Sequence, residues 1–248
     1  MKNEITTLPE QHSLPLSIFL HLLPGILTGT TFFLIAPFVQ RNNLPPFMAL
    51  CLADLVVLLP LIFGYLFYQG YKRNGQLSLE GVILYREKVR TWEYFVFVPV
   101  VFFASGLLIV ALSSVGNSIL NSIFAWWPAM FNLAADLSPY SRSALIFSYI
   151  VNFVMVSLAA PITEEIYFRG YLLPRLSRYG LWALSINSIL FALFHIWTPW
   201  MAVARAVGLI PLIYAAQKKQ NIYIGMLAHI LVNSLDVATG VMFILKQK

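Results

Sequence analysis

Long apolar runs, each of about 20 residues and long enough to cross a bilayer as a helix, constrain the fold of this sequence more than any other feature. Hydrophobic residues make up 59% of the chain and charged residues only 10%. A soluble domain carries about a quarter of its residues as charges, so too little polar surface exists here to cover such a core. In lipid, backbone polar groups must be paired within helices or closed barrels, and the runs lack the strict alternation of barrel strands. The sequence therefore predicts an all-α fold, a polytopic transmembrane helical bundle.

Windows of about 19 residues predict seven spans and leave room for an eighth. The seven lie near 17–39, 46–68, 94–115, 143–163, 181–197, 201–216 and 221–245. The stretch 116–142, with Trp126 and Trp127, is expected to form an interfacial helix or a poorly formed eighth span, since aromatic residues suit the headgroup level. The predicted organisation is an N-terminal tail at 1–16 and a single membrane domain at 17–248.

The basic residues indicate the orientation, because short cytoplasmic loops are enriched in Lys and Arg. Most of them fall in the loop 69–93 and near Arg175 and Lys218. With these loops inside, the N-terminus is inside and, for an odd number of spans, the C-terminus is outside. The expected location is a bacterial inner or plasma membrane, with the active site opening toward the cytoplasm. The net charge of +6 is scattered without a basic patch, so lipid rather than nucleic acid is the expected partner.

One cluster of ionisable residues lies at the expected end of the fourth span. Such groups cost several kcal/mol at membrane depth unless they are paired or face water, so each is a functional candidate. Glu165 and Arg169 stand four apart, with the acid on the N-terminal side, which favours an ion pair. Glu164 points about 100° away from that pair. We therefore expect Arg169 to hold Glu165, and Glu164 to face a polar cavity as a general base. A salt-bridged helix end alone would leave Glu164 unexplained.

Two further clusters add histidines. His195 lies near the end of the fifth predicted span, and His229 and Asn233 stand four apart on one face of the seventh. Glu164 and a histidine could activate a water molecule, while histidine and asparagine donors could stabilise an oxyanion. Glutamate and two histidines could also bind zinc, through Glu164, His195 and His229, although the H-E-x-x-H helix motif is absent and the metal-free site is favoured. Asp236 shares the face of Asn233 and is expected to orient a histidine or to lie near the outer water.

At these residues the sequence resembles the CPBP family of membrane proteases, which includes the type II CAAX prenyl endopeptidases and bacterial relatives once called Abi proteins. The motifs E-E-x-x-x-R, F-x-x-x-H and H-x-x-x-N occur in order, beginning at Glu164, Phe191 and His229. The resemblance covers about 143–240.

The resemblance implies that Glu164 and His195 activate the hydrolytic water, that His229 and Asn233 stabilise the oxyanion, and that Glu165 and Arg169 are supporting. Its eukaryotic members remove the last three residues after a prenylated cysteine. The implied substrate here is a peptide or lipidated protein.

The expected function is thus a membrane-embedded endopeptidase. One alternative is a non-catalytic immunity or peptide-binding protein on the same fold, which would tolerate loss of Glu164. Another is a proton-coupled transporter, for which we see no internal repeats or broken helices.

Overall fold

The computed structural model describes residues 10–134 and 136–247. Within these residues the chain forms helices and connecting loops, with one isolated antiparallel bridge between Arg86 and Asn221. The all-α prediction is confirmed. Most of the tail predicted at 1–16 lies outside the described residues, and the first helix begins at Leu14. The division into tail and single membrane domain stays a prediction.

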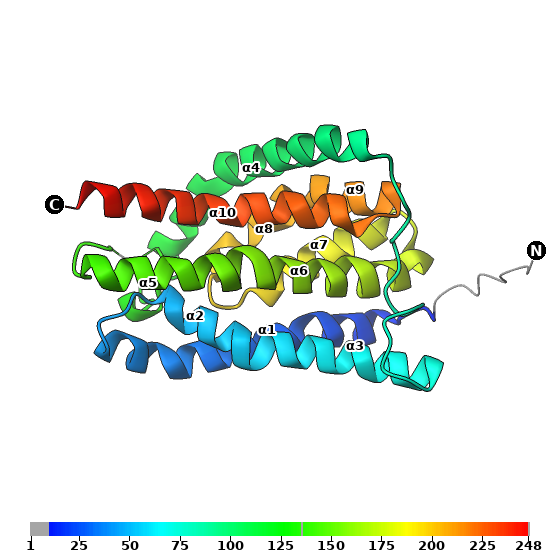
Figure 1. Cartoon of the computed structure of the whole chain (residues 1–248), viewed down its shortest axis with the longest axis horizontal. Coiled ribbons are helices and arrows are strands. Elements are labelled where there is room, and N and C mark those ends of the chain that lie inside the picture. The colour runs from blue at the N-terminus through cyan, green and yellow to red at the C-terminus, as the bar shows by residue number, and fades with distance from the viewer. Residues whose placement is uncertain (1–9, 135, 248) are drawn as a thin grey trace, which may run out of the picture.

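The helices pack side by side as a bundle (Figure 1). The α-helices are α1 (Leu14–Arg41), α2 (Phe47–Ala53), α3 (Leu59–Asn74), α4 (Thr91–Ser122), α5 (Arg142–Asn152), α6 (Ala160–Glu164), α7 (Trp182–Phe194), α8 (Ala202–Gly208), α9 (Ile210–Lys219) and α10 (Ile222–Lys246). The π-helical segments are η1 (Asp54–Leu58), η3 (Phe153–Ala159) and η4 (Glu165–Leu172), and the 3-10 segments are η2 (Ala129–Phe131), η5 (Leu173–Tyr179) and η6 (Pro199–Met201).

Fewer helices than the seven to eight spans predicted are long and apolar enough to cross a membrane. Five continuous helices among the described residues are long and apolar enough to cross a membrane: Leu14–Arg41, Phe47–Asn74, Thr91–Ser122, Arg142–Tyr179 and Ile222–Lys246. A sixth is reached if α8 and α9, with the η6 turn before α8, count as one span bent by 42°.

The difference between the predicted and observed numbers of spans arises in three segments, 181–197, 201–216 and 116–142. The span expected near 181–197 contains only α7, whose 13 residues reach about 20 Å against a hydrocarbon core of about 30 Å. The span expected at 201–216 is the bent pair. The stretch 116–142 holds the end of α4 and the short turn η2 but no further span.

The two ends of the bundle differ in charge. The α1 N-terminus and the connection between α3 and α4 lie at one end, and the C-terminus of α10 lies at the other (Figure 1). The first end, here called the basic end, holds Lys72, Arg73, Arg86, Lys88, Arg90, Arg175, Arg178, Lys218 and Lys219. At the opposite end the described basic residues are Arg41, Arg142 and Lys246. The positive-inside rule predicts that the basic end is the cytoplasmic one.

Close packing of α1 against α7 positions the C-terminal end of α7. A Cβ atom added at Gly25 would lie 2.1 Å from the Phe194 carbonyl oxygen, and one at Gly29 would lie 2.4 Å from the Ile196 side chain. Only glycine permits this approach, which places Phe194 and Ile196, the residues on either side of His195, directly against α1. The small-residue pair in α1 therefore serves packing within the chain.

We expect Gly25→Ala to destabilise the protein by about 1–3 kcal/mol, because the added methyl group must push α1 and α7 apart. Gly64→Ala is the matched control, since a Cβ atom there meets nothing within 4 Å. Thermal unfolding of both variants in detergent measures the difference. Equal Tm values for Gly25→Ala and the wild type would contradict the packing described here.

Candidate active site

The longest continuous helix, Arg142–Tyr179, carries both glutamates of the first motif. Its regular α-helical hydrogen bonding is interrupted, since the π-helical segments η3 and η4 flank the five residues of α6. Pro161 lacks a backbone N–H and lies within this interrupted region. π-Helical turns inside α-helices are frequently found at functional sites. The helix continues to Tyr179, so Glu164 lies in its interior and not at the membrane end that the predicted span 143–163 implied.

The carboxylate of Glu164 faces two imidazole rings. Its Oε1 lies 4.0 Å from His195 Nε2, and its Oε2 lies 3.8 Å from His229 Nε2. Glu164 is only 4% exposed. Both separations exceed the length of a direct hydrogen bond, so a water molecule or a substrate atom can lie between the carboxylate and the rings. Glu164, His195 and His229, which were predicted to converge from three separate helices, do come together.

The orientation of His195 is set by its own helix. His195 is the C-terminal cap of α7, and its Nδ1 donates to the Phe191 carbonyl oxygen at 2.9 Å. A carbonyl oxygen can only accept, so Nδ1 carries the proton in the neutral ring. The unprotonated Nε2 then faces Glu164. This is the tautomer that can accept a hydrogen bond or a proton from a water molecule held between the two residues.

Glu165 orients the second histidine. Its Oε1 accepts from His229 Nδ1 at 3.0 Å and lies 3.2 Å from Arg169 Nη1. The guanidinium of Arg169 also lies over the Phe191 ring, 4.0 Å from its centre. Glu165 and Arg169 are fully buried, and their predicted ion pair is present. The two adjacent glutamates therefore do different jobs, since Glu165 holds His229 and Arg169 while Glu164 faces the cavity.

Asn233 lies one helical turn beyond His229 on α10, a helix whose start is fixed by the Asn221 side chain accepting from two backbone N–H groups. Its Nδ2 donates to the Val156 carbonyl oxygen at 2.9 Å. Val156 belongs to the π-helical segment η3, where the altered hydrogen-bond pattern can leave carbonyl oxygens available. This contact fixes the amide and leaves the second N–H of Nδ2 for a ligand.

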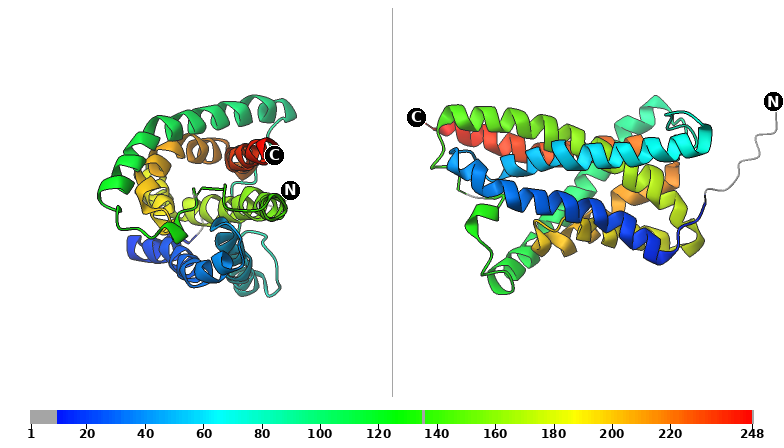
Figure 2. Two further views of the ribbon diagram at one scale, coloured as in Figure 1. Left: turned by 90° about the vertical axis from the view of Figure 1, so that its left-hand side faces the viewer. Right: turned by 90° about the horizontal axis from the view of Figure 1, so that it is seen from below.

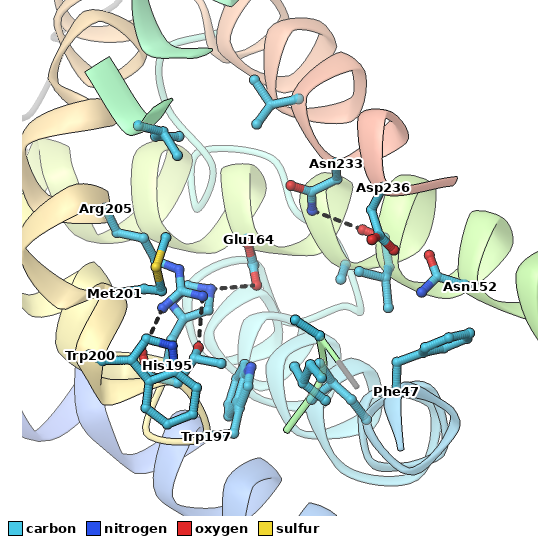
Figure 3. Close-up of a pocket in the computed structure, with 18 of the residues that line it drawn as sticks. Phe47, Asn152, Glu164, His195, Trp197, Trp200, Met201, Arg205, Asn233 and Asp236 are labelled. Atoms are coloured by element: carbon cyan, nitrogen blue, oxygen red, sulfur yellow. Dashed lines mark hydrogen bonds and ion pairs between the residues drawn. The ribbon is translucent and has the colours of Figure 1, made fainter. Parts of the chain in front are cut away.

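A cavity of about 660 Å³ lies in front of these groups (Figure 3). The residues lining it include all four predicted catalytic residues, Glu164, His195, His229 and Asn233. Asp236 lines the same cavity, but no hydrogen bond of its carboxylate to either histidine is present, since Phe191 and Glu165 supply those acceptors. Asp236 is exposed, in keeping with the second role expected for it, a position near the outer water.

The cavity lies in the half of the bundle away from the basic end. Its outer lining comes from the beginning of α2 at Phe47, the end of α4 at Asn117 and Leu120, the loop 132–134 and the outer part of α10 at Asp236. All these segments lie at the end of the bundle that holds the C-terminus (Figure 1), and the left view of Figure 2 looks at the molecule from that end. If the basic end is cytoplasmic, this placement does not support the expected cytoplasmic opening. That expectation rested on Glu164 being at the end of a span.

The donor set is of a kind that zinc binds, because Glu164, His195 and His229 supply one oxygen and two nitrogens. Zinc bonds to such donors are about 2.0–2.2 Å long. Within the described part of the chain no group of three or more His, Cys, Asp or Glu side chains is close enough to hold a metal ion. The metal-free arrangement stays a prediction that a chelator tests below.

Two charged residues that line the cavity were not predicted as part of the site. One is Arg205 from α8. Asp54 also lines the cavity, and among the described residues the two form no ion pair. The signal that could have identified Arg205 is its charge at membrane depth. His21, in contrast, is a buried structural residue whose ring nitrogens contact Ser17 and Asn187.

Comparison with known proteins agrees with the motifs. Residues 146–235 match the family model described as type II CAAX prenyl endopeptidase Rce1-like. This segment contains all three motifs, from Glu164 to Asn233, so the resemblance noted in the sequence is confirmed. No curated protein and no solved structure matches the chain.

Proposed function

We propose that this chain, whose residues 146–235 are of the Rce1-like type II CAAX prenyl endopeptidase family, is a membrane-embedded endopeptidase that uses Glu164 to activate water. The observation that carries the proposal is the buried Glu164 carboxylate facing the Nε2 atoms of His195 and His229 at 4.0 and 3.8 Å. The spacing suits a bound water. The cavity in front of it is large enough for several residues of a peptide.

In the proposed reaction a water molecule between Glu164 and His195 attacks the scissile carbonyl carbon. Glu164 accepts the water proton, with the unprotonated Nε2 of His195 as a second acceptor. The carbonyl oxygen becomes an oxyanion, which accepts hydrogen bonds from the free N–H of Asn233 and from His229 when its ring is doubly protonated. Collapse of this intermediate breaks the C–N bond. The proton held by Glu164 passes to the leaving nitrogen, and a new carboxylate and a new amine result.

A fluorogenic prenylated C-terminal peptide is the first substrate to test, because the family match is to CAAX prenyl endopeptidases. The purified wild type in detergent is expected to cleave it, whereas His229→Ala should lose about 10²- to 10³-fold in kcat, the effect of removing an oxyanion donor. The His12→Ala variant is the control, since that ring lies outside the cavity lining. Undiminished cleavage by His229→Ala would contradict the proposed role.

The same assay tests whether hydrolysis requires a metal ion. Activity that survives a chelator is expected of the metal-free mechanism. Loss on chelation with recovery on adding zinc would instead assign Glu164, His195 and His229 as ligands of a catalytic ion. No cleavage of any peptide in a defined library would favour the alternative, a peptide-binding protein.

The side of the membrane at which the cavity opens is a second part of the proposal. Because the cavity lies in the half away from the basic end, we propose that it faces the outer side of the membrane. Cysteine labelling in intact cells tests this in a Cys51→Ala background, since Cys51 is the single cysteine. A membrane-impermeant maleimide should label Asn132→Cys at the cavity mouth but not Lys218→Cys at the basic end. The reverse pattern would place the cavity on the cytoplasmic side.

A further inference from the structure

Arg205 is a cationic side chain inside the cavity that the proposed mechanism does not use. Figure 3 shows it reaching from α8 toward His195 and Glu164. Its Nη1 donates to the Thr198 carbonyl oxygen at 3.2 Å, and its Nη2 donates to Thr198 Oγ1 at 2.7 Å. Both acceptors are neutral. They hold the guanidinium in place without balancing its charge.

Among the described residues, no carboxylate oxygen lies within 4.0 Å of the Arg205 guanidinium. Arg169, the other buried arginine of the site, is paired with Glu165 at 3.2 Å. A buried cation at membrane depth costs several kcal/mol unless an anion or water compensates it. Arg205 therefore differs from Arg169 in having its charge directed into a cavity and in lacking a carboxylate within ion-pair distance, since Glu164, the acid whose charge acts on it, lies farther away.

The donors that remain on Arg205 suit a carboxylate. A guanidinium has five N–H groups, of which two are engaged with Thr198, so three are left for a ligand. A planar guanidinium binds a carboxylate through two parallel hydrogen bonds, stronger than neutral ones. The carboxylate that every linear peptide carries is at its C-terminus. A peptide anchored there would place a bond near its C-terminal end beside Glu164.

We propose that Arg205 is a specificity residue that binds the free C-terminal carboxylate of the peptide substrate. This inference rests on the proposed function, since it assigns a role to Arg205 in the same cavity. It predicts that the enzyme prefers peptides cut close to a free C-terminus. It also predicts that internal loops and peptides with blocked C-termini are poor substrates.

The test uses two peptides of identical sequence, one with a free C-terminal carboxylate and one with a C-terminal amide. The wild type is expected to favour the acid by about 10- to 100-fold in kcat/KM, mainly through KM, as for loss of a charge-assisted hydrogen bond. Arg205→Gln should lower hydrolysis of the acid far more than hydrolysis of the amide, so that the ratio of kcat/KM between the two peptides falls to about one. Arg205→Lys should retain part of the preference, since it keeps the charge but not the planar donor pair.

Arg142→Gln is the matched control, because this arginine lies at the outer end of α5 and does not line the cavity. It should keep the full preference. Equal hydrolysis of acid and amide by the wild type would overturn the inference and leave the proposed function standing. An equal loss on both peptides in Arg205→Gln would assign Arg205 a structural role and also overturn it.

A binding measurement tests this inference independently of catalysis. In the Glu164→Gln background, which is expected to bind without cleaving, fluorescence anisotropy should show tighter binding of the acid than of the amide. Adding Arg205→Gln should remove that difference. Retention of the difference without Arg205 would contradict the assignment, whether or not the wild type hydrolyses the peptides.

Discussion

Replacing Glu164 by Gln is expected to lower kcat/KM for peptide hydrolysis by about 10²- to 10⁴-fold, the contribution typical of general acid–base catalysis. The amide has nearly the same shape but cannot accept a proton from water. Among the described residues the Glu164 carboxylate makes no direct hydrogen bond, and its oxygens lie 3.8 and 4.0 Å from the ring nitrogens of His229 and His195. The exchange should therefore leave folding and membrane insertion intact, so lost activity reports on chemistry. Purified variants assayed at equal concentration give the ratio.

Asp236→Asn is the control for this experiment, since Asp236 also contributes a carboxylate to the cavity lining but contacts neither histidine. It should keep most of the wild-type activity. Equal activity of Glu164→Gln and the wild type would remove the basis of the proposed mechanism and would favour the peptide-binding alternative.

Replacing Arg169 by Met is expected to destabilise the protein by about 3–5 kcal/mol. Glu165 would then keep a fully buried charge without the guanidinium that lies 3.2 Å away. Methionine roughly preserves the length of the side chain, so loss of charge is the main change. Thermal unfolding in detergent, with size-exclusion chromatography to score monodisperse protein, measures the effect. A Tm within about one degree of the wild type would contradict the importance of the pair.

The double variant Glu165→Leu with Arg169→Met separates stability from activity. Removing both charges of a buried pair is often neutral or stabilising, so most of the lost stability should return. Activity should not return, because His229 Nδ1 loses the Glu165 oxygen that it contacts at 3.0 Å. Restored activity together with restored stability would mean that Glu165 serves only to neutralise Arg169.

The parts of the fold that follow from local composition could be predicted. Apolar length and the scarcity of charge indicate membrane helices, and the spacing of Glu165 and Arg169 predicted a pair that the structure contains. The number of spans could not be predicted as reliably. Hydropathy averaged over a window detects the apolar residues of α7. It does not detect that the helix ends after 13 residues, at His195. Pro161 is a local signal for an interrupted helix, but one proline does not specify the π-helical segments on both sides of α6.

The sequence predicted which residues form the site better than it predicted how those residues contact one another. The three motifs identified Glu164, His195, His229 and Asn233, because charged and polar groups are conspicuous in apolar helices. Which acceptor orients which histidine depends on contacts between residues 64 positions apart, as for Glu165 and His229. The side on which the cavity opens was inferred from a predicted span end at 163. The helix in fact runs on to Tyr179, which moves Glu164 inward.

The most direct test of the central claim, that Glu164 activates water for peptide hydrolysis, is mass spectrometry of a defined peptide library incubated with purified protein in ¹⁸O-labelled water. The proposed mechanism predicts new carboxylates that each carry one ¹⁸O atom with the wild type, and none above background with an equally monodisperse Glu164→Gln variant. Labelled products formed by Glu164→Gln at the wild-type rate would contradict the claim.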